Sequence, residues 1–313
     1  MRLRRSDTAS RRRLMRGVLA SAAVAALPRA VFPAATPETA MLTRPIPSTG
    51  EPMPVIGLGT YQVFDVGKLA ARPALRQVTS LLLERGGRMI DSSPMYGTAE
   101  AVTGEVLADL KARPKAFLAT KVWISGKERG IAQMRQSAER FRTDVIDLMQ
   151  IHNLLDWQVH LQTLRTMKDA GKIRYLGITH YTTSALGQLA DIIARERIDF
   201  VQLGYSIETR EPEARVLKLC AERGVAVIVN QPFEQGGLFA KVRGRALPDW
   251  AAEFDCTSWA QFFLKYLTGH PAITCVIPAT EKPDHMSDDL AAGYGKQPDA
   301  KQRARMAQFW EKL

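Results

Sequence analysis

Short apolar runs alternate along most of the chain with segments in which apolar residues recur at helical spacing. The runs are typical of buried strands, and the spaced segments are typical of amphipathic helices. Strands are predicted at residues 55–60, 88–91, 117–121, 145–152, 173–179, 200–203, 225–230 and 273–277. Helices are predicted at about 73–86, 99–111, 131–142, 157–170, 183–195, 212–223 and 258–268. The pattern therefore predicts eight strands that alternate with helices.

Turn residues support this alternation. Glycine ends several predicted helices just before the next strand, as at Gly87 and Gly224, which is typical of a helix-to-strand turn. Two short apolar pieces flank residues 47–50 and predict a β-hairpin ahead of the first strand. The whole pattern favours one α/β domain over residues 42–313, a closed (β/α)8 TIM barrel with an N-terminal β-hairpin. An open doubly wound sheet is disfavoured, because Gly57-Leu-Gly59 lacks the third glycine of the dinucleotide-binding fingerprint.

The formal charge of +11 is unevenly distributed. Residues 1–35 contain eight Arg and one Asp, a charge of +7, which leaves +4 for the remaining residues. A nucleic-acid interface requires basic residues gathered on a folded surface rather than in a leader. We therefore exclude nucleic acid as a partner.

The basic leader resembles a twin-arginine export signal. Arg11 and Arg12 form the arginine pair, and Leu14 stands where the motif has a bulky apolar residue. The apolar run 17–27 that follows is too short to span a bilayer. We expect residues 1–35 to hold the signal and its cleavage region, and the mature protein, without an integral membrane segment, to be periplasmic or otherwise exported by the twin-arginine machinery. A disordered basic tail is the alternative.

The three cysteines, Cys220, Cys256 and Cys275, are widely separated and lie in apolar surroundings. We interpret them as small core residues, and a disulfide between two of them is the alternative in an oxidising compartment. The chain shows no metal-ligand spacing, so no metal is predicted.

Ionisable or hydrogen-bonding side chains close three consecutive predicted strands. Asp91, Lys121 and His152 end the second, third and fourth strands, and Tyr96 follows five residues after Asp91. The C-terminal ends of barrel strands meet at one rim, where catalytic groups of such barrels lie. A phenol takes part in proton transfer near neutrality only if a cationic neighbour lowers its pKa, and Lys121 is the candidate. A structural ion pair, a surface tyrosine and a core histidine are the alternatives for these residues taken singly.

Seven short motifs occur in the order found in aldo-keto reductases, and the chain resembles that family over residues 42–313. The motifs are Gly57-Leu-Gly-Thr60, Asp91-Ser-Ser-Pro-Met-Tyr-Gly97, Ala119-Thr-Lys121, Gln150-Ile-His152, Gly171-Lys-Ile-Arg-Tyr-Leu-Gly177, Val201-Gln-Leu-Gly-Tyr205 and Ile277-Pro278.

The resemblance implies reduction of a small aldehyde or ketone by hydride from a reduced nicotinamide cofactor. Tyr96 is then the general acid, and Lys121 lowers its pKa. Asp91 holds and neutralises Lys121, while His152 donates a hydrogen bond to the carbonyl oxygen.

The resemblance also implies a set of cofactor contacts. Gln202 is expected to hold the nicotinamide carboxamide and Tyr205 to stack on the ring, with Thr179 and His180 standing where the family has Ser and Asn. The expected cofactor-binding residues are Gly59, Thr60, Thr179, His180, Gln202, Tyr205, Pro232, Gly236, Gly237, Leu238, Ile277, Pro278, Thr280, His285, Asp288 and Asp289.

The cofactor expected from the family is NADP(H), and NAD(H) stays open. The two cations that clamp the 2′-phosphate in the family are replaced by Ala279 and His285, and Thr280 and Lys282 remain nearby.

Two other functions and the substrate stay open as well. The alternatives are a cofactor-binding redox sensor or partner-binding subunit, and a lyase or isomerase that uses Lys121 in a Schiff base. Trp123 and Phe64 are candidates for apolar pocket walls.

Overall fold

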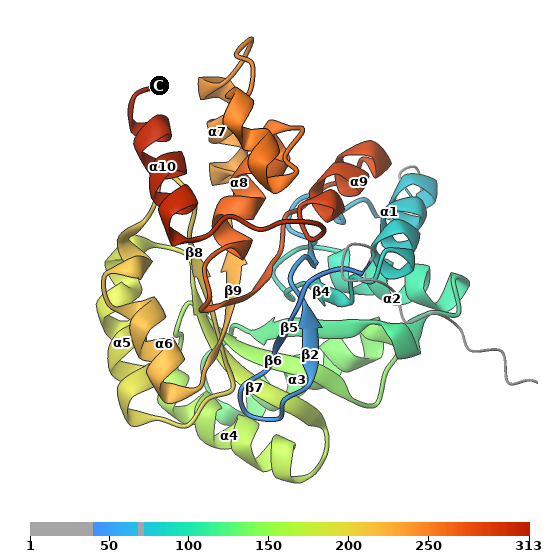
Figure 1. The fold of residues 1–313 in the computed structure, drawn as a ribbon. Helices are drawn as coiled ribbons and strands as arrows, with labels where there is room; N and C mark the ends of the chain where they lie inside the picture. The colour runs from blue at the N-terminus through green and yellow to red at the C-terminus, as the bar shows by residue number, and fades with distance from the viewer. Residues whose placement is uncertain (1–39, 68–71) are drawn as a thin grey trace, which may run out of the picture. The chain divides into compact units, whose positions relative to one another are not determined.

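Eight parallel strands form the central sheet in the computed structural model of this chain, which describes residues 40–67 and 72–313 (Figure 1). They are hydrogen-bonded in sequence order, and single bridges from Ile56 to Val276 and from Gly59 to Ala279 join the first strand to the last. The strands are β3 (Leu58–Gly59), β4 (Met89–Asp91), β5 (Phe117–Val122), β6 (Ile146–His152), β7 (Ile173–His180), β8 (Phe200–Gly204), β9 (Ala226–Asn230) and β10 (Ile273–Val276). The predicted (β/α)8 barrel is confirmed. The predicted export signal, residues 1–35, lies outside the described residues.

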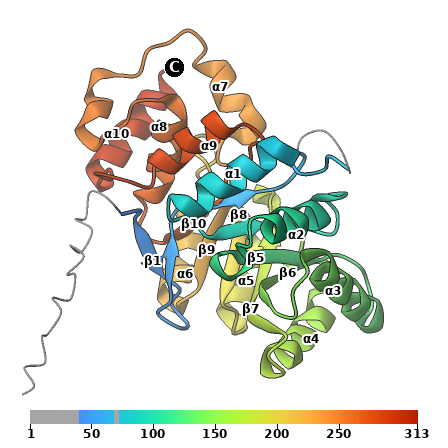
Figure 2. The same ribbon diagram turned by 90° about the vertical axis from the view of Figure 1, so that its right-hand side faces the viewer.

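Helices surround the strands, as the two perpendicular views show (Figures 1 and 2). Seven of them follow the predicted helices: α1 (Arg72–Glu84), α2 (Ala99–Asp109), α3 (Lys127–Phe141), α4 (Trp157–Asp169), α5 (Leu186–Arg195), α6 (Val216–Arg223) and α8 (Trp259–Thr268). The described chain also forms α7 (Gly237–Lys241), α9 (Pro283–Ala291) and α10 (Ala300–Glu311). Helix α3 begins four residues before the prediction, because its first turn is polar and its apolar periodicity starts only at Ile131.

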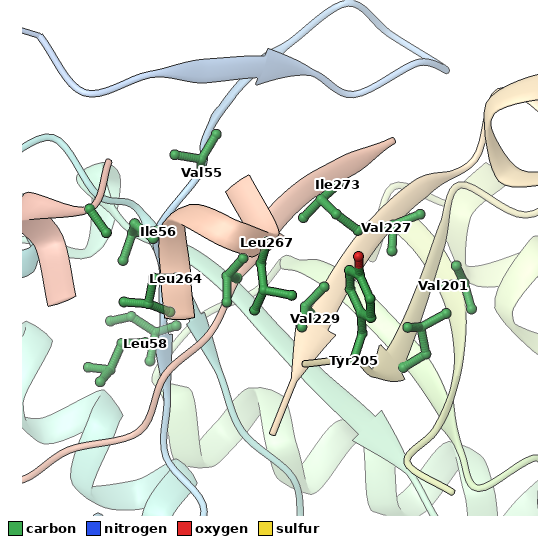
Figure 3. Packing of buried hydrophobic residues seen from close by; sticks show 14 of the residues in the cluster. Val55, Ile56, Leu58, Val201, Tyr205, Val227, Val229, Leu264, Leu267 and Ile273 are labelled. Carbon is green, nitrogen blue, oxygen red and sulfur yellow. The ribbon is translucent and has the colours of Figure 1, made fainter. Parts of the chain in front are cut away.

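Alternate residues of each strand contribute to two different cores. Side chains on one face pack against the helices, as Val227, Val229 and Ile273 do beside Leu264 and Leu267 of α8 (Figure 3). The opposite face fills the barrel interior, because successive strand residues point to opposite sides. The interior cluster consists of Ile46, Met53, Met89, Phe117, Ala119, Leu148, Tyr175, Phe200, Ala226, Ile228, Cys275 and Ile277.

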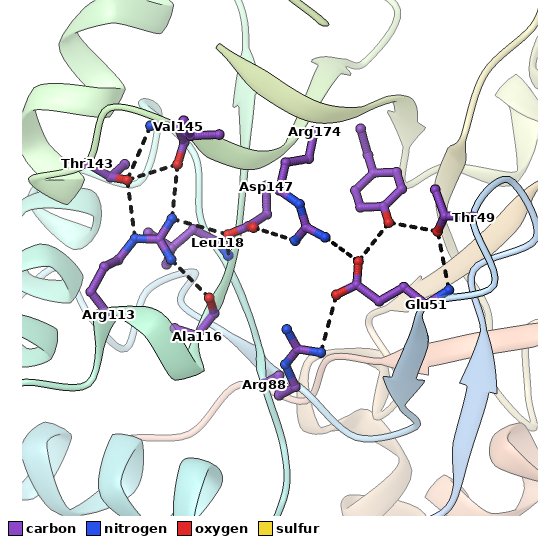
Figure 4. A network of polar contacts seen from close by, with 11 residues as sticks. Thr49, Glu51, Arg88, Arg113, Ala116, Leu118, Thr143, Val145, Asp147 and Arg174 are labelled. Atoms are coloured by element: carbon purple, nitrogen blue, oxygen red, sulfur yellow. Dashed lines mark hydrogen bonds and ion pairs between the residues drawn. The ribbon is translucent and has the colours of Figure 1, made fainter. Parts of the chain in front are cut away.

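The predicted N-terminal hairpin is present as β1 (Thr43–Pro45) paired antiparallel with β2 (Pro52–Pro54). Its residues Ile46 and Met53 belong to the interior cluster, so the hairpin covers the N-terminal end of the barrel. Polar contacts fasten it there (Figure 4). Glu51 accepts a hydrogen bond from the Tyr175 hydroxyl at 2.7 Å and pairs with Arg174 and Arg88.

The cysteines behave as predicted: Cys220, Cys256 and Cys275 are free and buried. Burial raises the pKa of the Cys220 thiol to about 12, so it carries a proton at neutral pH. Within residues 40–67 and 72–313, no helix has both the length and the apolar character needed to cross a membrane.

Candidate active site

A cavity of about 940 Å³ lies at the C-terminal ends of the barrel strands. Asp91, Tyr96 and His152 line it, and Lys121 is buried directly beside Asp91. The structure thus brings together the four side chains that the sequence predicts at successive strand ends. Among the described residues no cluster of three or more His, Cys, Asp or Glu side chains is arranged to hold a metal ion.

Asp91 and Lys121 form a buried ion pair with satisfied hydrogen bonds. Lys121 Nζ lies 2.6 Å from Asp91 Oδ2, and it also donates to the Ser92 carbonyl oxygen at 2.7 Å. Asp91 Oδ1 accepts hydrogen bonds from the side-chain amides of Gln150 at 3.0 Å and Gln202 at 2.8 Å. Burial has the largest single effect and would lower the pKa of Lys121, but the charges and hydrogen bonds of Asp91 and Tyr96 together outweigh it, so the pKa is raised. The Lys121 side chain is therefore an ammonium group.

Tyr96 lies over this ion pair, with Lys121 Nζ 5.0 Å from the centroid of its ring. Burial raises the pKa of the phenol, and the neighbouring Lys121 charge lowers it only in part, so the net shift is upward. Lys121 does lower this pKa, as expected, but it does not bring the pKa below its ordinary value, because burial of the phenolate has the larger effect. At neutral pH Tyr96 therefore keeps the proton that a general acid must donate.

His152 faces Tyr96 across the cavity, and the two ring centroids are 6.1 Å apart in an edge-to-face arrangement. Burial lowers the pKa of His152 to about 3, with further lowering by the charges of Lys121 and His180. The imidazole is thus neutral at physiological pH. Its Nδ1 lies 3.2 Å from the hydroxyl of Ser93.

Most of the predicted cofactor residues line the same cavity. They are Gly59, Thr60, Thr179, Gln202, Pro232, Gly236, Ile277, Thr280, His285, Asp288 and Asp289. The amide of Gln202 is already engaged within the protein. It donates to Asp91 and to Gln150, and its oxygen accepts from Asn230 at 3.2 Å and from Thr179 at 3.4 Å.

Tyr205 is placed away from the cavity, so its predicted stacking role is wrong. Its ring packs among the residues between β8 and the outer helices (Figure 3), and its hydroxyl bonds to Glu213 and accepts from Arg303 at 2.7 Å. The reason is strand parity. Gln202 faces the interior, and a residue three positions later faces the opposite side of the strand.

Four other predicted residues are absent from the cavity lining. His180 and Pro278 follow the inward-facing Thr179 and Ile277 by one position, so they point outward by the same parity. Gly237 and Leu238 lie in α7, and Leu238 is buried in the outer core. Phe64, a predicted pocket wall, is fully buried in that core as well, whereas Trp123 does line the cavity.

Sequence reasoning missed several cavity residues. Asn230 ends β9 on the interior face, with the same parity as Ala226 and Ile228, and its Oδ1 is buried without a hydrogen-bond partner in the described chain. The strand-end rule used for His152 would have found it.

The mouth of the cavity is apolar. Every large hydrophobic side chain that is exposed in the described residues lines it, and their exposed fractions range from 37% to 49%. These side chains are Tyr61, Met95, Trp123, Tyr181 and Phe239. A contiguous exposed apolar surface of this kind marks a ligand-binding region.

The far end of the cavity is acidic. Asp289 is buried, and burial followed by the charge of Asp288 raises its carboxyl pKa well above the usual range. Asp288 Oδ1 accepts a hydrogen bond from Gln261 Nε2 of α8 at 2.6 Å. Ala279 and His285 line this end beside them.

The model of the Aldo/keto reductase family matches residues 55–311. Aldo-keto reductase YhdN of Bacillus subtilis is 25% identical over 214 residues, which cover 63% of this chain and 63% of that protein. Methylglyoxal reductase YeaE of Escherichia coli is 26% identical over 248 residues, which cover 76% of this chain and 85% of that protein.

Solved structures share the fold. An aldo/keto reductase from Klebsiella pneumoniae in complex with NADP and acetate aligns with a TM-score of 0.70 at 23% identity, covering 83% of this chain and 93% of that one. A holo aldo-keto reductase from Bacillus halodurans aligns with a TM-score of 0.71 at 22% identity, covering 86% and 96%.

Replacement of the buried carboxylate tests the ion pair. Asp91→Asn leaves the Lys121 ammonium buried without its counter-charge, and we expect the free energy of unfolding to fall by about 3–5 kcal/mol. Urea denaturation measures this loss. The double variant Asp91→Asn, Lys121→Met removes both charges and should recover most of the stability. A loss below about 1 kcal/mol in the single variant would show that Lys121 does not depend on Asp91.

Proposed function

The chain belongs to the aldo/keto reductase family, and we propose that it reduces an aldehyde or ketone to an alcohol with a nicotinamide cofactor. This proposal rests on one observation. A protonated phenol, a buried ion pair and a neutral imidazole converge in one cavity at the catalytic end of the barrel.

Each of the four residues has a distinct part in the reaction. Tyr96 donates its proton to the carbonyl oxygen as negative charge develops there. Lys121 stabilises the phenolate that remains, since its ammonium group lies 5.0 Å from the ring centroid. Asp91 keeps that ammonium group charged and in place. His152 donates a hydrogen bond that polarises and orients the carbonyl.

The residues of the cavity fit a nicotinamide dinucleotide, which supplies the hydride when bound. A volume of about 940 Å³ is sufficient for a large cofactor. At the catalytic end, the unpartnered Oδ1 of Asn230 is an acceptor for an amide group, and Thr179 lies beside it. Thr280 would hold the phosphate-bearing part, because a hydroxyl donor suits phosphate oxygens, and Gly236 lines the cavity without a side chain that would block it.

NADP(H) is the cofactor we propose. The Klebsiella pneumoniae enzyme was solved with NADP and also with NADPH. In this chain Lys282 stands at the N-cap of α9 without a side-chain cap, so its charge and the first-turn N–H groups are available to a 2′-phosphate.

The substrate class follows from the mouth of the cavity. Tyr61, Met95 and Trp123 present apolar surface beside Tyr96 and His152, which favours carbonyl compounds with an apolar substituent. Relatives named methylglyoxal reductases make methylglyoxal a second substrate to test.

The alternative functions are not favoured. A sensing or partner-binding subunit does not require a complete proton-transfer set, and this chain has one. A Schiff-base mechanism requires an unprotonated lysine, whereas the pKa of Lys121 is raised and its Nζ is committed to Asp91 and Ser92.

Removal of the Tyr96 hydroxyl tests the general acid. Tyr96→Phe should lower kcat for aldehyde reduction roughly 100- to 10,000-fold, because only the proton donor is lost. The dissociation constant of the cofactor, measured by fluorescence quenching, should stay within about twofold of that of the native protein, since the phenyl ring remains. Wild-type protein that binds cofactor but reduces none of a panel of aldehydes, ketones and methylglyoxal would favour the subunit alternative.

Binding of the two reduced cofactors tests the phosphate site. We expect NADPH to bind more tightly than NADH to the wild type. Lys282→Ala should weaken NADPH about fivefold, because it removes one exposed charge contact, and should leave NADH binding unchanged. Equal affinities, or tighter binding of NADH, would contradict the phosphate assignment.

We propose that residues 1–35 direct export by the twin-arginine route, on the strength of Arg11, Arg12 and the short apolar run after them. Replacing both arginines by lysine should reduce the exported fraction by about tenfold while keeping the charge of the segment. Cell fractionation of a bacterium expressing the full chain measures this. The matched control replaces Arg4 and Arg5 by lysine and should be exported normally. Equal export of both variants would contradict the twin-arginine assignment, and absence of export of every form would favour a plain basic tail.

A further inference from the structure

Ser93 begins the turn that carries Tyr96, and it contacts His152 as well. The Ser93 carbonyl oxygen accepts a hydrogen bond from the Tyr96 N–H at 3.0 Å, with Pro94 at the second position of the turn. Its Oγ accepts from the Met95 N–H at 3.2 Å and lies 3.2 Å from His152 Nδ1. One buried serine therefore fixes the backbone of the phenol and touches the ring of the imidazole.

The hydrogen bonds of Ser93 determine where its proton points. If Nδ1 carried a hydrogen and donated it to Oγ, the hydroxyl hydrogen would have no acceptor among the described residues. Ser93 is fully buried, so that unpaired donor would carry the full desolvation cost. If the hydroxyl donates to Nδ1 instead, both bonds of Oγ are satisfied.

The neutral imidazole ring of His152 is then restricted to one tautomer. Since the pKa of His152 is lowered to about 3, the ring carries a single proton at neutral pH. With Nδ1 acting as acceptor, that proton is on Nε2. No described residue is hydrogen-bonded to Nε2, and His152 lines the cavity.

We propose that Ser93 is a positioning residue that holds His152 in its Nε2–H tautomer, so that the ring offers the substrate oxygen a donor instead of a lone pair. The opposite tautomer would direct a lone pair at an oxygen that becomes negative. A neutral imidazole is also a poor acid, which leaves proton donation to Tyr96 alone. The role towards substrate rests on the proposed function, whereas the tautomer does not.

Nitrogen NMR of the ¹⁵N-histidine-labelled protein at pH 7 measures the tautomer without any substrate. We expect His152 Nε2 to give a protonated, pyrrole-type shift and Nδ1 a pyridine-type shift. In Ser93→Ala the shifts should move toward a mixture of tautomers, because the donor to Nδ1 is gone. A wild-type ring protonated on Nδ1, or an unchanged ratio in Ser93→Ala, overturns the proposal.

Ser92→Ala is the matched control for loss of a neighbouring buried hydroxyl. Ser92 Oγ accepts from Thr60 Oγ1 at 2.9 Å, and the hydroxyl partner of His152 is Ser93, not Ser92. The ring shifts of His152 should therefore match the wild type in this variant. If Ser92→Ala mixes the tautomers to the same extent, general loosening of the turn explains the effect and the proposal fails.

Kinetics provide the second measurement. Ser93→Ala should lower kcat about tenfold with little change in the KM for cofactor, since one buried hydrogen bond that orients the substrate-facing donor is lost. Ser93→Thr restores a hydroxyl and should recover part of kcat. A kcat in Ser93→Ala equal to that of the wild type overturns the role in catalysis. Absence of turnover in every form, with the expected NMR result, would overturn the proposed function and leave the tautomer assignment standing.

Discussion

The buried ion pair of Asp91 and Lys121 is the constraint on which the site depends. Two charges removed from water are tolerable only if each is paired and hydrogen-bonded, and here the carboxylate accepts from one ammonium and two amides. The amides belong to Gln150 and Gln202, on two other strands. Satisfying one charge pair therefore ties β4, β5, β6 and β8 together at the catalytic rim.

Burial is the main cause of the protonation states around this pair, and the charge of the pair modifies them. Burial keeps the phenol of Tyr96 protonated, and the fixed ammonium of Lys121 adds to the burial that keeps His152 neutral. The two residues proposed to contact the substrate therefore have different roles. Tyr96 donates a proton, whereas His152 donates a hydrogen bond. The hairpin network around Glu51 lies at the opposite end of the barrel from the cavity (Figure 4).

Strand-end reasoning brought together the four side chains proposed as catalytic, because it relies on topology alone. Parallel strands of a closed barrel present their C-terminal ends at one rim, so residues from three consecutive strands and the loop after the first of them meet whatever the details of packing. Tyr205, His180 and Pro278 were expected as cofactor contacts from the family resemblance, and they are absent from the cavity lining although they lie near strand ends. Counting in steps of two within each strand from its own interior residue separates inward from outward positions. Phe200 of β8 gives Gln202, and Ala226 and Ile228 of β9 would have pointed to Asn230.

The sequence by itself determined the barrel, the hairpin and the four side chains that we propose as catalytic, because hydrophobic periodicity and strand-end placement are local properties of the chain. Only the tertiary structure decided the protonation states, since desolvation depends on what surrounds a group and not on its neighbours in sequence. It also decided that the Gln202 amide is engaged by Asp91 and that Ser93 reaches His152. Those contacts join segments 59 to 111 residues apart, and no short-range pattern encodes them.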